Sequence, residues 1–237
     1  MSDDSYSTLK IERHGDVARL ALNRPDKLNS FNATLRGELL HAANALNDDP
    51  ELRVIILAGE GRAFSAGADL ADGQDGDPAN VGDATEHMLN ADYKPAILAI
   101  AESNKLWIAE VGGAAAGIGS AFMLACDLVV MAEGAYLYQA FAAISLIPDG
   151  GATWQLLNAV GRKRAFEIII GGERVYGEEC RNLGLCNRVV ADGEESDAAL
   201  TWARELAMKA PLAVRYTKKA LAMAGGMSLG DMITQEA

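Results

Sequence analysis

Hydrophobic residues in the first part of the chain form short runs that predict buried β-strands. Residues 7–22 alternate in polarity on both sides of a His-Gly-Asp turn, which is typical of a hairpin. The apolar runs 53–58 and 106–111 are rich in β-branched residues, and each of them ends at a glycine-rich turn. Two further strands are expected over 127–132 and, more briefly, over 135–138.

Helical spacing of apolar residues alternates with these strands. A helix is expected over 33–47 and another over 86–103, because their apolar residues recur every three or four positions. The segment 120–125 is apolar throughout, which predicts a helix buried on all sides. From about residue 151 the pattern is mostly helical, apart from a short strand at 187–190. This order predicts an α/β core followed by a helical C-terminal part.

The two glycine-rich turns, 61–70 and 112–120, are the candidate chemical feature of the chain. Glycine lets the backbone approach a ligand closely, and an N–H at the start of a helix has no partner within that helix. Two such turns could direct backbone N–H groups at one developing oxyanion. Spacing alone leaves a second interpretation equally open, in which both are tight turns without chemistry.

Composition narrows the possible functions. Half of the 237 residues are hydrophobic, which is enough for a sizeable core, and the formal net charge is −12. That charge argues against a nucleic-acid surface, which needs lysine and arginine to neutralise phosphates. No apolar run reaches the length of a membrane span, and the acidic N-terminus lacks the features of a signal peptide. A cytoplasmic protein without membrane or nucleic-acid partners is therefore expected.

The residues that could bind metals are dispersed. Three cysteines and three histidines form no zinc or disulfide pattern, so no metal site is expected. Residues 71–85 are rich in Asp and Gly but lack the spacing and closing Glu of an EF-hand, so we expect a solvated, mobile loop. Neither glycine turn is followed by Gly-Lys-Ser/Thr, and Phe122 replaces the third glycine of a dinucleotide fingerprint. Ala63 replaces the first glycine of a serine-hydrolase elbow.

Several sequence blocks, in order, closely resemble the crotonase superfamily of enoyl-CoA hydratases and isomerases. Each block alone is moderately specific, whereas the occurrence of all the blocks in this order is a strong indication of the resemblance. The blocks are Leu22-Asn-Arg-Pro-Asp-Lys-Leu-Asn-Ser-Phe31, Phe64-Ser-Ala-Gly-Ala-Asp-Leu70, Ala116-Gly-Ile-Gly119 through Ala125-Cys-Asp-Leu128, Leu146-Ile-Pro-Asp-Gly-Gly151, Leu157-Asn-Ala-Val-Gly-Arg162 and Gly184-Leu-Cys-Asn-Arg-Val-Val190.

The resemblance implies a fold and a class of substrate. It predicts an α/β spiral of ββα units over residues 1–190 and a helical trimerisation region over 191–237. Relatives usually continue for further helices, so this C-terminal region is expected to be incomplete. The implied substrate is an acyl-coenzyme A thioester, with no separate cofactor. The implied assembly is a homotrimer, or a hexamer made of two trimers.

The resemblance also implies site residues. The oxyanion donors would be the backbone N–H groups of Ala68 and Ile118; the presence of Ile118 is similar to the isomerase branch. Arg24 and Lys27 are candidates for contact with the phosphates of coenzyme A. The residues expected to bind the substrate and coenzyme A are Arg24, Lys27, Leu28, Asn29, Ala66, Asp69, Leu70, Gly117 and Phe141.

The catalytic side chains depart from the hydratase pattern. At the two positions where hydratases carry glutamates, this chain has Ala121 and Phe141, and neither can move a proton. Asp149 matches the position at which Δ3,Δ2-enoyl-CoA isomerases and the similar ring-opening isomerases of phenylacetate breakdown place their acid. Without that match, Asp149 in Pro-Asp-Gly would be interpreted as a turn residue. With it, Asp149 is the expected catalytic base, with Phe122, Phe141 and Ile144 as apolar neighbours that raise its pKa.

The expected reaction moves a double bond from a 3-enoyl-CoA to a 2-enoyl-CoA through an enolate, with Asp149 as the single acid and base. One alternative keeps the fold and uses Asp149 for hydration or for opening a ring epoxide. Another is a relative that binds acyl-CoA or RNA without catalysis, although the acidic charge argues against RNA.

Overall fold

The larger of two β-sheets lies at the centre of the fold and has six strands within the described residues. The computed structural model describes residues 6–72 and 81–237. The order in the larger sheet is β1-β2-β3-β5-β7-β10. The first two strands form the expected antiparallel hairpin, and every other neighbouring pair is parallel. The strands are β1 (Leu9–His14), β2 (Val17–Leu22), β3 (Val54–Gly59), β5 (Leu106–Val111), β7 (Leu128–Ala132) and β10 (Arg188–Val190).

A smaller sheet arises inside the glycine-rich turns. The sequence suggested plain strand-to-helix turns there, but each turn contains a three-residue strand. These strands pair in the order β4-β6-β8-β9, and β9 was not expected because three residues carry no periodic signal. The strands are β4 (Ala63–Ser65), β6 (Ala114–Ala116), β8 (Tyr136–Tyr138) and β9 (Arg174–Tyr176).

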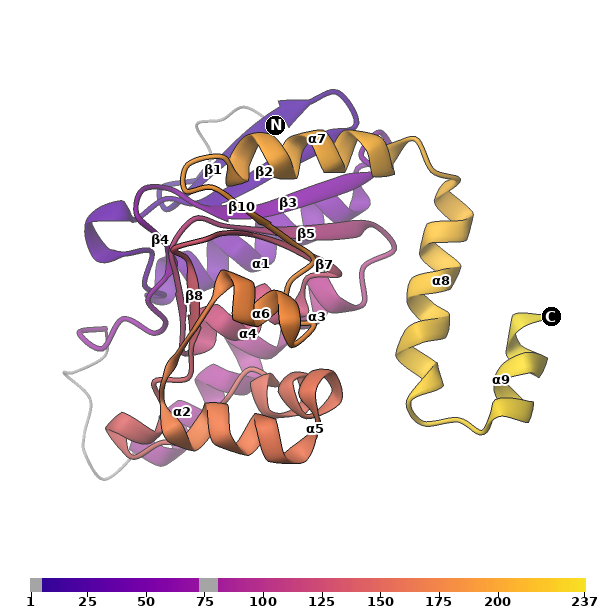
Figure 1. Ribbon diagram of the computed structural model, residues 1–237. Helices are drawn as coiled ribbons and strands as arrows, with labels where there is room; N and C mark the ends of the chain where they lie inside the picture. Colours follow the sequence, from indigo (N-terminus) through magenta and orange to yellow (C-terminus); the bar gives the residue numbers. More distant parts are fainter. Residues whose placement is uncertain (1–5, 73–80) are drawn as a thin grey trace.

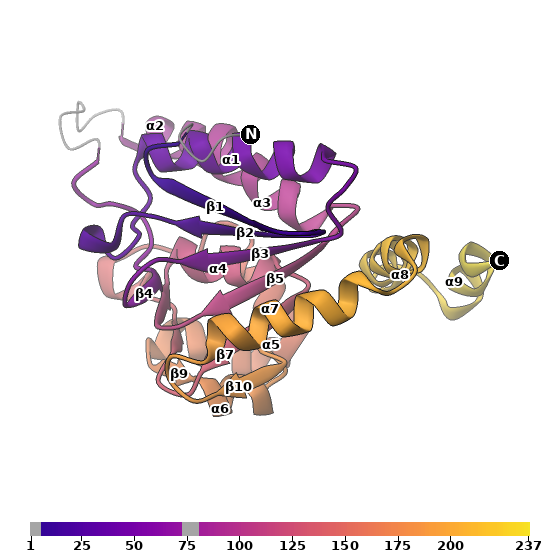
Figure 2. The same cartoon turned by 90° about the horizontal axis from the view of Figure 1, so that it is seen from above.

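The chain repeats one unit as it winds. Each repeat gives one strand to the larger sheet, the next to the smaller sheet, and then a helix that packs beside the preceding one (Figures 1 and 2). This arrangement confirms the predicted spiral of ββα units. The helices of the spiral are α1 (Ala33–Asp48), α2 (Val81–Met88), α3 (Lys94–Ala101), α4 (Ile118–Ala125) and α5 (Ala152–Gly171).

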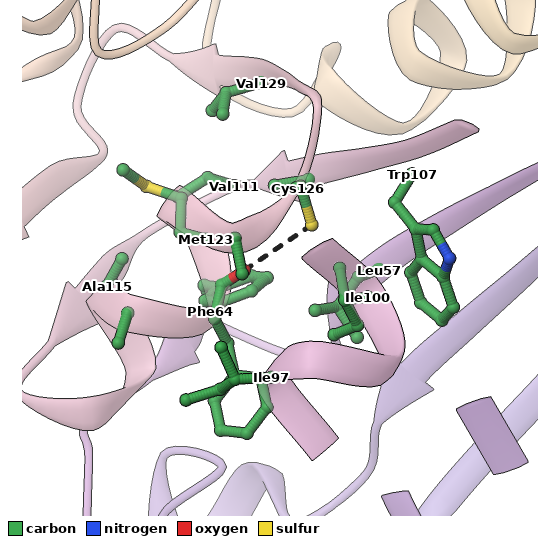
Figure 3. Close-up of a cluster of buried hydrophobic side chains, with 14 of the residues drawn as sticks. Leu57, Phe64, Ile97, Ile100, Trp107, Val111, Ala115, Met123, Cys126 and Val129 are labelled. Carbon is green, nitrogen blue, oxygen red and sulfur yellow. Dashed lines mark hydrogen bonds between the residues drawn. The ribbon is translucent and has the colours of Figure 1, made fainter. Parts of the chain in front are cut away.

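Alternation along the strands of the larger sheet separates two apolar layers. Ile55 and Leu57 face the main core, which also holds Trp107 and the helices of the spiral (Figure 3). Val54 and Ile56 face the other side, where Ala199, Ala203 and Ala207 of α7 (Glu195–Ala207) pack against them. Because these alanines recur every four residues, α7 presents a narrow stripe that lets the helix lie close to the sheet.

The last two helices lie outside this body. After α6 (Gly177–Asn182) and α7, the chain continues into α8 (Pro211–Ala224) and α9 (Leu229–Glu236), neither of which has a buried residue (Figures 1 and 2). Lys218 ties α8 to the core: its Nζ donates to the carbonyls of Ile100 and Lys105 at 3.0 and 3.3 Å and pairs with Asp127 at 2.9 Å. The predicted C-terminal region therefore contains one helix on the sheet and two that project from it.

The helix predicted over 86–103 differs in its details. It begins earlier, at Val81. The loop predicted over 71–85 therefore ends sooner than expected, and part of that loop lies outside the described residues. Between α2 and α3 the chain forms a π-helical segment, η4 (Leu89–Tyr93), instead of continuous α-helix. Such segments occur frequently at functional sites.

Replacing Gly113 with alanine should destabilise the fold. A Cβ there would overlap the backbone carbonyl of Arg62, next to the β4–β6 pair, so one of the two chains would have to shift. We expect a loss of about 1–3 kcal/mol or more in the free energy of unfolding. Gly37→Ala is the matched control, because its Cβ meets nothing within 4 Å inside α1; it should gain about 0.5–1 kcal/mol. Urea denaturation of both variants measures the two changes, and a neutral Gly113→Ala would contradict the close approach.

Candidate active site

The two glycine-rich turns lie against each other. A Cβ on Gly67 would stand 3.0 Å from the Ala116 carbonyl oxygen and 3.6 Å from the Gly117 Cα. Both glycines have positive φ, 98° at Gly67 and 51° at Gly117, which a side chain would strain. The pairing of β4 with β6 brings the turns together, and only glycine permits this distance between the two backbones.

Hydrogen bonding to Phe31 orients the first predicted oxyanion donor. The Phe31 N–H donates to the Gly67 carbonyl at 2.8 Å, and the Asp69 N–H donates to the Phe31 carbonyl at 3.1 Å. In this parallel bridge the N–H of Ala68 points away from Phe31. Among residues 6–72 and 81–237 it has no backbone acceptor, and Ala68 itself is exposed.

The second predicted donor, Ile118, is the first residue of α4. Its N–H has no acceptor within the helix, and the helix dipole makes this end attractive to negative charge. Gly117 is held by its own N–H, which donates to the Tyr138 carbonyl at 3.0 Å. Ser120 Oγ donates to the Gly117 carbonyl at 2.6 Å and accepts from the buried Gln139 at 2.8 Å. The turn is thus rigid, as preorganised stabilisation of an oxyanion requires.

Asp149 lies beside the second turn. The residue after it, Gly150, packs so closely that a Cβ there would overlap Ile118 and stand 2.9 Å from both Ala121 Cβ and Ile97 Cδ1. Gln155 Nε2 also donates to the Ala121 carbonyl at 3.3 Å, which fixes the start of α5 against α4. The segment carrying Asp149 is therefore held next to Ile118, as the sequence predicted.

A cavity of about 480 Å³ opens in front of Asp149. Residues from α2, η4 and α3 form one wall, and the segment 146–151 forms the other. Of the residues that line it, Asp149 and Lys94 are the ionisable ones. The lining residues from the helices are Thr85, Leu89, Lys94, Ile97 and Leu98.

Burial raises the pKa of Asp149 to about 6. Its Oδ1 is buried and has no hydrogen-bond partner in the described part of the chain. The raised pKa agrees with the expectation from sequence, but the apolar neighbours differ. Phe122, Phe141 and Ile144 do not line the cavity: Phe122 stacks on Phe31 inside the core, with ring centroids 4.8 Å apart, and Ile144 is 48% exposed.

Sequence reasoning missed the helical wall of the cavity. The pattern over 86–103 predicted a helix, but it did not show that Leu89, Ile97 and Leu98 would face Asp149. The π-helical segment η4 interrupts the helix in this wall. The spacing of apolar residues in the sequence does not reveal such an interruption.

Ala121 and Phe141, which the sequence matched to the hydratase glutamate positions, carry no ionisable group. Ala121 is fully buried against Gly150, and Phe141 is 5% exposed with its ring near Gly117. No carboxylate is contributed from either position. The candidate site therefore combines one carboxylic acid with two backbone N–H groups that have no backbone acceptor within the described ranges.

Two of the residues expected to bind coenzyme A have structural roles instead. Asn29 is fully buried, and its amide donates to the carbonyls of Glu60 and Ala63 at 2.9 and 2.8 Å, so it cannot line a channel. Arg24 pairs with Asp69 at 3.0 Å and also donates to the Ser30 carbonyl, so its guanidinium is largely occupied within the protein. Both side chains hold the first turn in place.

The remaining predicted contacts lie around the two turns. Lys27 and Ala66 are exposed, Leu28 is half-buried, and Leu70 is 66% exposed. Gly117 is buried at the base of the turn.

The described residues contain no group of three or more His, Cys, Asp or Glu that could hold a metal ion. The three cysteines are free and buried. None of the helices within the described ranges is long and apolar enough to cross a membrane.

The family model for enoyl-CoA hydratase/isomerase matches residues 12–237. The chain belongs to this family, which lies in the crotonase superfamily. It is 39% identical to a probable enoyl-CoA hydratase of Rhodobacter capsulatus over 79% of this chain and 70% of the relative. It is 33% identical to 1,2-epoxyphenylacetyl-CoA isomerase of Escherichia coli over 93% of this chain and 84% of the relative. The crystal structure of an enoyl-CoA hydratase from Polaromonas sp. JS666 superposes with a TM-score of 0.90 at 31% identity, covering 97% of this chain and 89% of that one.

Asp149→Asn should stabilise the protein above pH 6. Because burial raises the pKa of the folded-state carboxyl to about 6, the folded state keeps this proton at pH values where the unfolded state has lost it. Stability therefore falls as pH rises from about 4 to about 6, and the cost of the buried charge stays in full at higher pH. Asparagine carries no charge, so the two proteins should melt together at pH 4 and separate above pH 6. Melting curves across that range test this, and a constant difference would contradict the shift.

Proposed function

We propose that this protein is an acyl-CoA isomerase that converts a 3-enoyl-CoA into a 2-enoyl-CoA. The observation that carries the proposal is Asp149, a carboxylic acid at the second oxyanion turn, together with Ala121 and Phe141 where a hydratase carries glutamates. Hydration by two carboxylates needs a second acid or base to position and activate water. A double-bond shift needs one group that removes a proton and returns it two carbons away.

The thioester carbonyl oxygen binds the N–H groups of Ala68 and Ile118. Asp149 removes a proton from C2, and the electron pair moves onto the thioester oxygen to give an enolate. The two fixed N–H donors stabilise that oxygen more strongly as its charge grows. The protonated Asp149 then delivers the proton to C4, the double bond forms between C2 and C3, and the carboxylate is regenerated.

The environment of Asp149 suits both steps. A pKa of about 6 leaves the carboxylate mostly ionised at neutral pH, yet makes it a stronger base than an exposed aspartate. The apolar residues Leu89, Ile97 and Leu98 limit the access of water to the enolate.

The coenzyme A part of the substrate follows the exposed side of the first turn. Lys27 is exposed and available to its phosphates, whereas Arg24 is paired with Asp69. Leu28, Ala66 and Leu70 contact the pantetheine arm, while the acyl chain passes Gly117 and Phe141 into the cavity before Asp149. Coenzyme A is part of the substrate, so no separate cofactor is required.

Asp149→Asn should reduce isomerisation by about 10²–10⁴-fold, the range expected for the loss of a general base. Turnover of 3-enoyl-CoA is followed by the absorbance of the conjugated product, with Asp197→Asn on the remote helix α7 as the matched control. Near-normal activity of Asp149→Asn would refute the assignment. Binding of acyl-CoA by the variant, measured by calorimetry, separates lost chemistry from lost binding.

A second candidate reaction is the opening of a ring epoxide. It is favoured by the 33% identity to 1,2-epoxyphenylacetyl-CoA isomerase, and it also needs one acid next to the held enolate. A panel of 3-enoyl-CoA, 2-enoyl-CoA and ring-1,2-epoxyphenylacetyl-CoA decides between isomerase, hydratase and epoxide isomerase. Binding without turnover of any of the three would instead indicate a non-catalytic acyl-CoA-binding protein.

The assembly that we propose is a homotrimer, alone or paired into a hexamer, formed through α8 and α9. The support is an apolar surface with no cover within the chain: Leu212, Leu221 and Leu229 are 63%, 71% and 78% exposed. Burying this surface against another copy would remove it from water. The wild type should sediment at three or six times 25.0 kDa, and Leu221→Glu should shift the distribution toward smaller species. A monomeric wild type would contradict the proposal.

A further inference from the structure

Tyr93 is a buried tyrosine in the core, directly behind the helical wall that faces Asp149. It is the last residue of η4, and it lies one turn from Leu89 on one side and from Ile97 on the other, both of which line the cavity. Its side chain is only 2% exposed. The ring packs edge-on against Phe31, with centroids 5.8 Å apart, and Phe31 is the residue that orients the Ala68 donor.

The hydroxyl of Tyr93 and Oδ1 of Asp149 share an unusual property. Both atoms are buried, and neither makes a hydrogen bond of ordinary geometry within the described residues, although the Arg36 guanidinium is close enough to the Tyr93 hydroxyl to oppose the rise of its pKa. A buried polar atom without a partner costs about 1–3 kcal/mol, so two in the same neighbourhood call for a physical explanation. One oxygen carries a proton to donate and the other can only accept when it is ionised.

Two charges, on Arg36 and on Asp149, act on the Tyr93 hydroxyl in opposite directions. Burial raises the pKa of Tyr93 to about 12, the Arg36 guanidinium opposes this, and the Asp149 carboxylate adds to it. Arg36 lies 5.6 Å from the centre of the Tyr93 ring and is itself held by Asp72 and Asp92 at 3.0 and 2.9 Å. At neutral pH the hydroxyl therefore keeps its proton. Because the Arg36 cation attracts the lone pairs of the Tyr93 hydroxyl, the hydroxyl proton points away from Arg36 in the favoured orientation.

Building on the proposed function, we propose that Tyr93 is a positioning residue for Asp149: its hydroxyl donates to Oδ1, directly or across one bridging water, when an acyl group fills the cavity. Catalytic hydrogen bonds are often long in the free enzyme and tighten in the complex. Holding Oδ1 in this way leaves Oδ2 as the oxygen that meets C2 and C4 of the substrate.

The consequence is a measurable change in how Asp149 titrates. A donor to Oδ1 stabilises the ionised carboxylate, so its removal should raise the pKa of Asp149. In Tyr93→Phe the acidic limb of the kcat profile should move to higher pH by about one unit, as the loss of a hydrogen bond to a charged group implies. The rate constant kcat should fall about tenfold while KM stays nearly constant, because the ordered carboxylate is needed for proton transfer rather than for binding.

The experiment titrates the Asp149 carboxyl by ¹³C NMR in the presence of saturating butanoyl-CoA, a thioester without a double bond that cannot be isomerised. The Asp149→Asn spectrum assigns the resonance. The control is Tyr6→Phe, which removes a hydroxyl that contacts His41 on the surface. We expect the carboxyl of Tyr93→Phe to titrate at higher pH than that of the wild type and of Tyr6→Phe. The same titration curve in all three proteins would overturn the inference.

A second measurement does not depend on the folding of Tyr93→Phe. Wild-type protein with all six tyrosines replaced by 3-fluorotyrosine carries a more acidic phenol at Tyr93, which is a stronger donor. Its Asp149 should titrate at lower pH than in unlabelled protein, and an unchanged titration would again count against Tyr93. Because butanoyl-CoA does not react, these results stand whether or not the substrate panel confirms an isomerase.

Discussion

The close approach of two backbones, at Gly67 and Gly117, is the constraint on which the site depends. Ala68 and Ile118 each follow one of these glycines, so the separation of the two donors is set by the contact between the turns. The short strands β4 and β6 impose that contact, and Gly119 continues it, since a Cβ there would lie 2.7 Å from Ser65 Cβ. The smaller sheet, made of three-residue strands, thus has a function out of proportion to its size.

The protein treats its buried charges in two different ways. Arg19 is almost buried in the larger sheet, where Glu110 and Glu60 receive its donors at 2.8 and 2.6 Å. Oδ1 of Asp149, in contrast, has no hydrogen-bond partner among the described residues. The first arrangement offsets the cost of desolvation, whereas the second leaves it in place. The uncompensated desolvation of the carboxylate raises its pKa and makes Asp149 a stronger base. Active sites commonly sacrifice stability for reactivity in this way.

The separation between main-chain donors and reactive side chains explains how one fold can serve several reactions. In the proposed reaction the two N–H donors would hold an enolate whatever its origin, and they are main-chain groups that tolerate changes of side chain. The outcome depends on the groups facing the enolate, which here are Asp149 and the apolar wall from η4 and α3. Ala121 and Phe141 carry no carboxylate, and in our proposal Tyr93 supplies a protic group behind Asp149. Specificity therefore lies in a few side chains on elements that are otherwise structural.

The sequence by itself determined the hairpin, the parallel strands, helix α1 and the glycine turns, because apolar periodicity and backbone conformation are local properties. The order of its motifs also indicated the spiral fold, the two donors and Asp149. Tertiary structure decided what local patterns cannot express. Asn29 became a buried support of the first turn and Arg24 a partly exposed one, and Leu89, Ile97 and Leu98, rather than Phe122, Phe141 and Ile144, enclosed Asp149. Packing across the whole core decides which face of a helix meets a loop some fifty residues away. The raised pKa of Asp149 arises only from that packing.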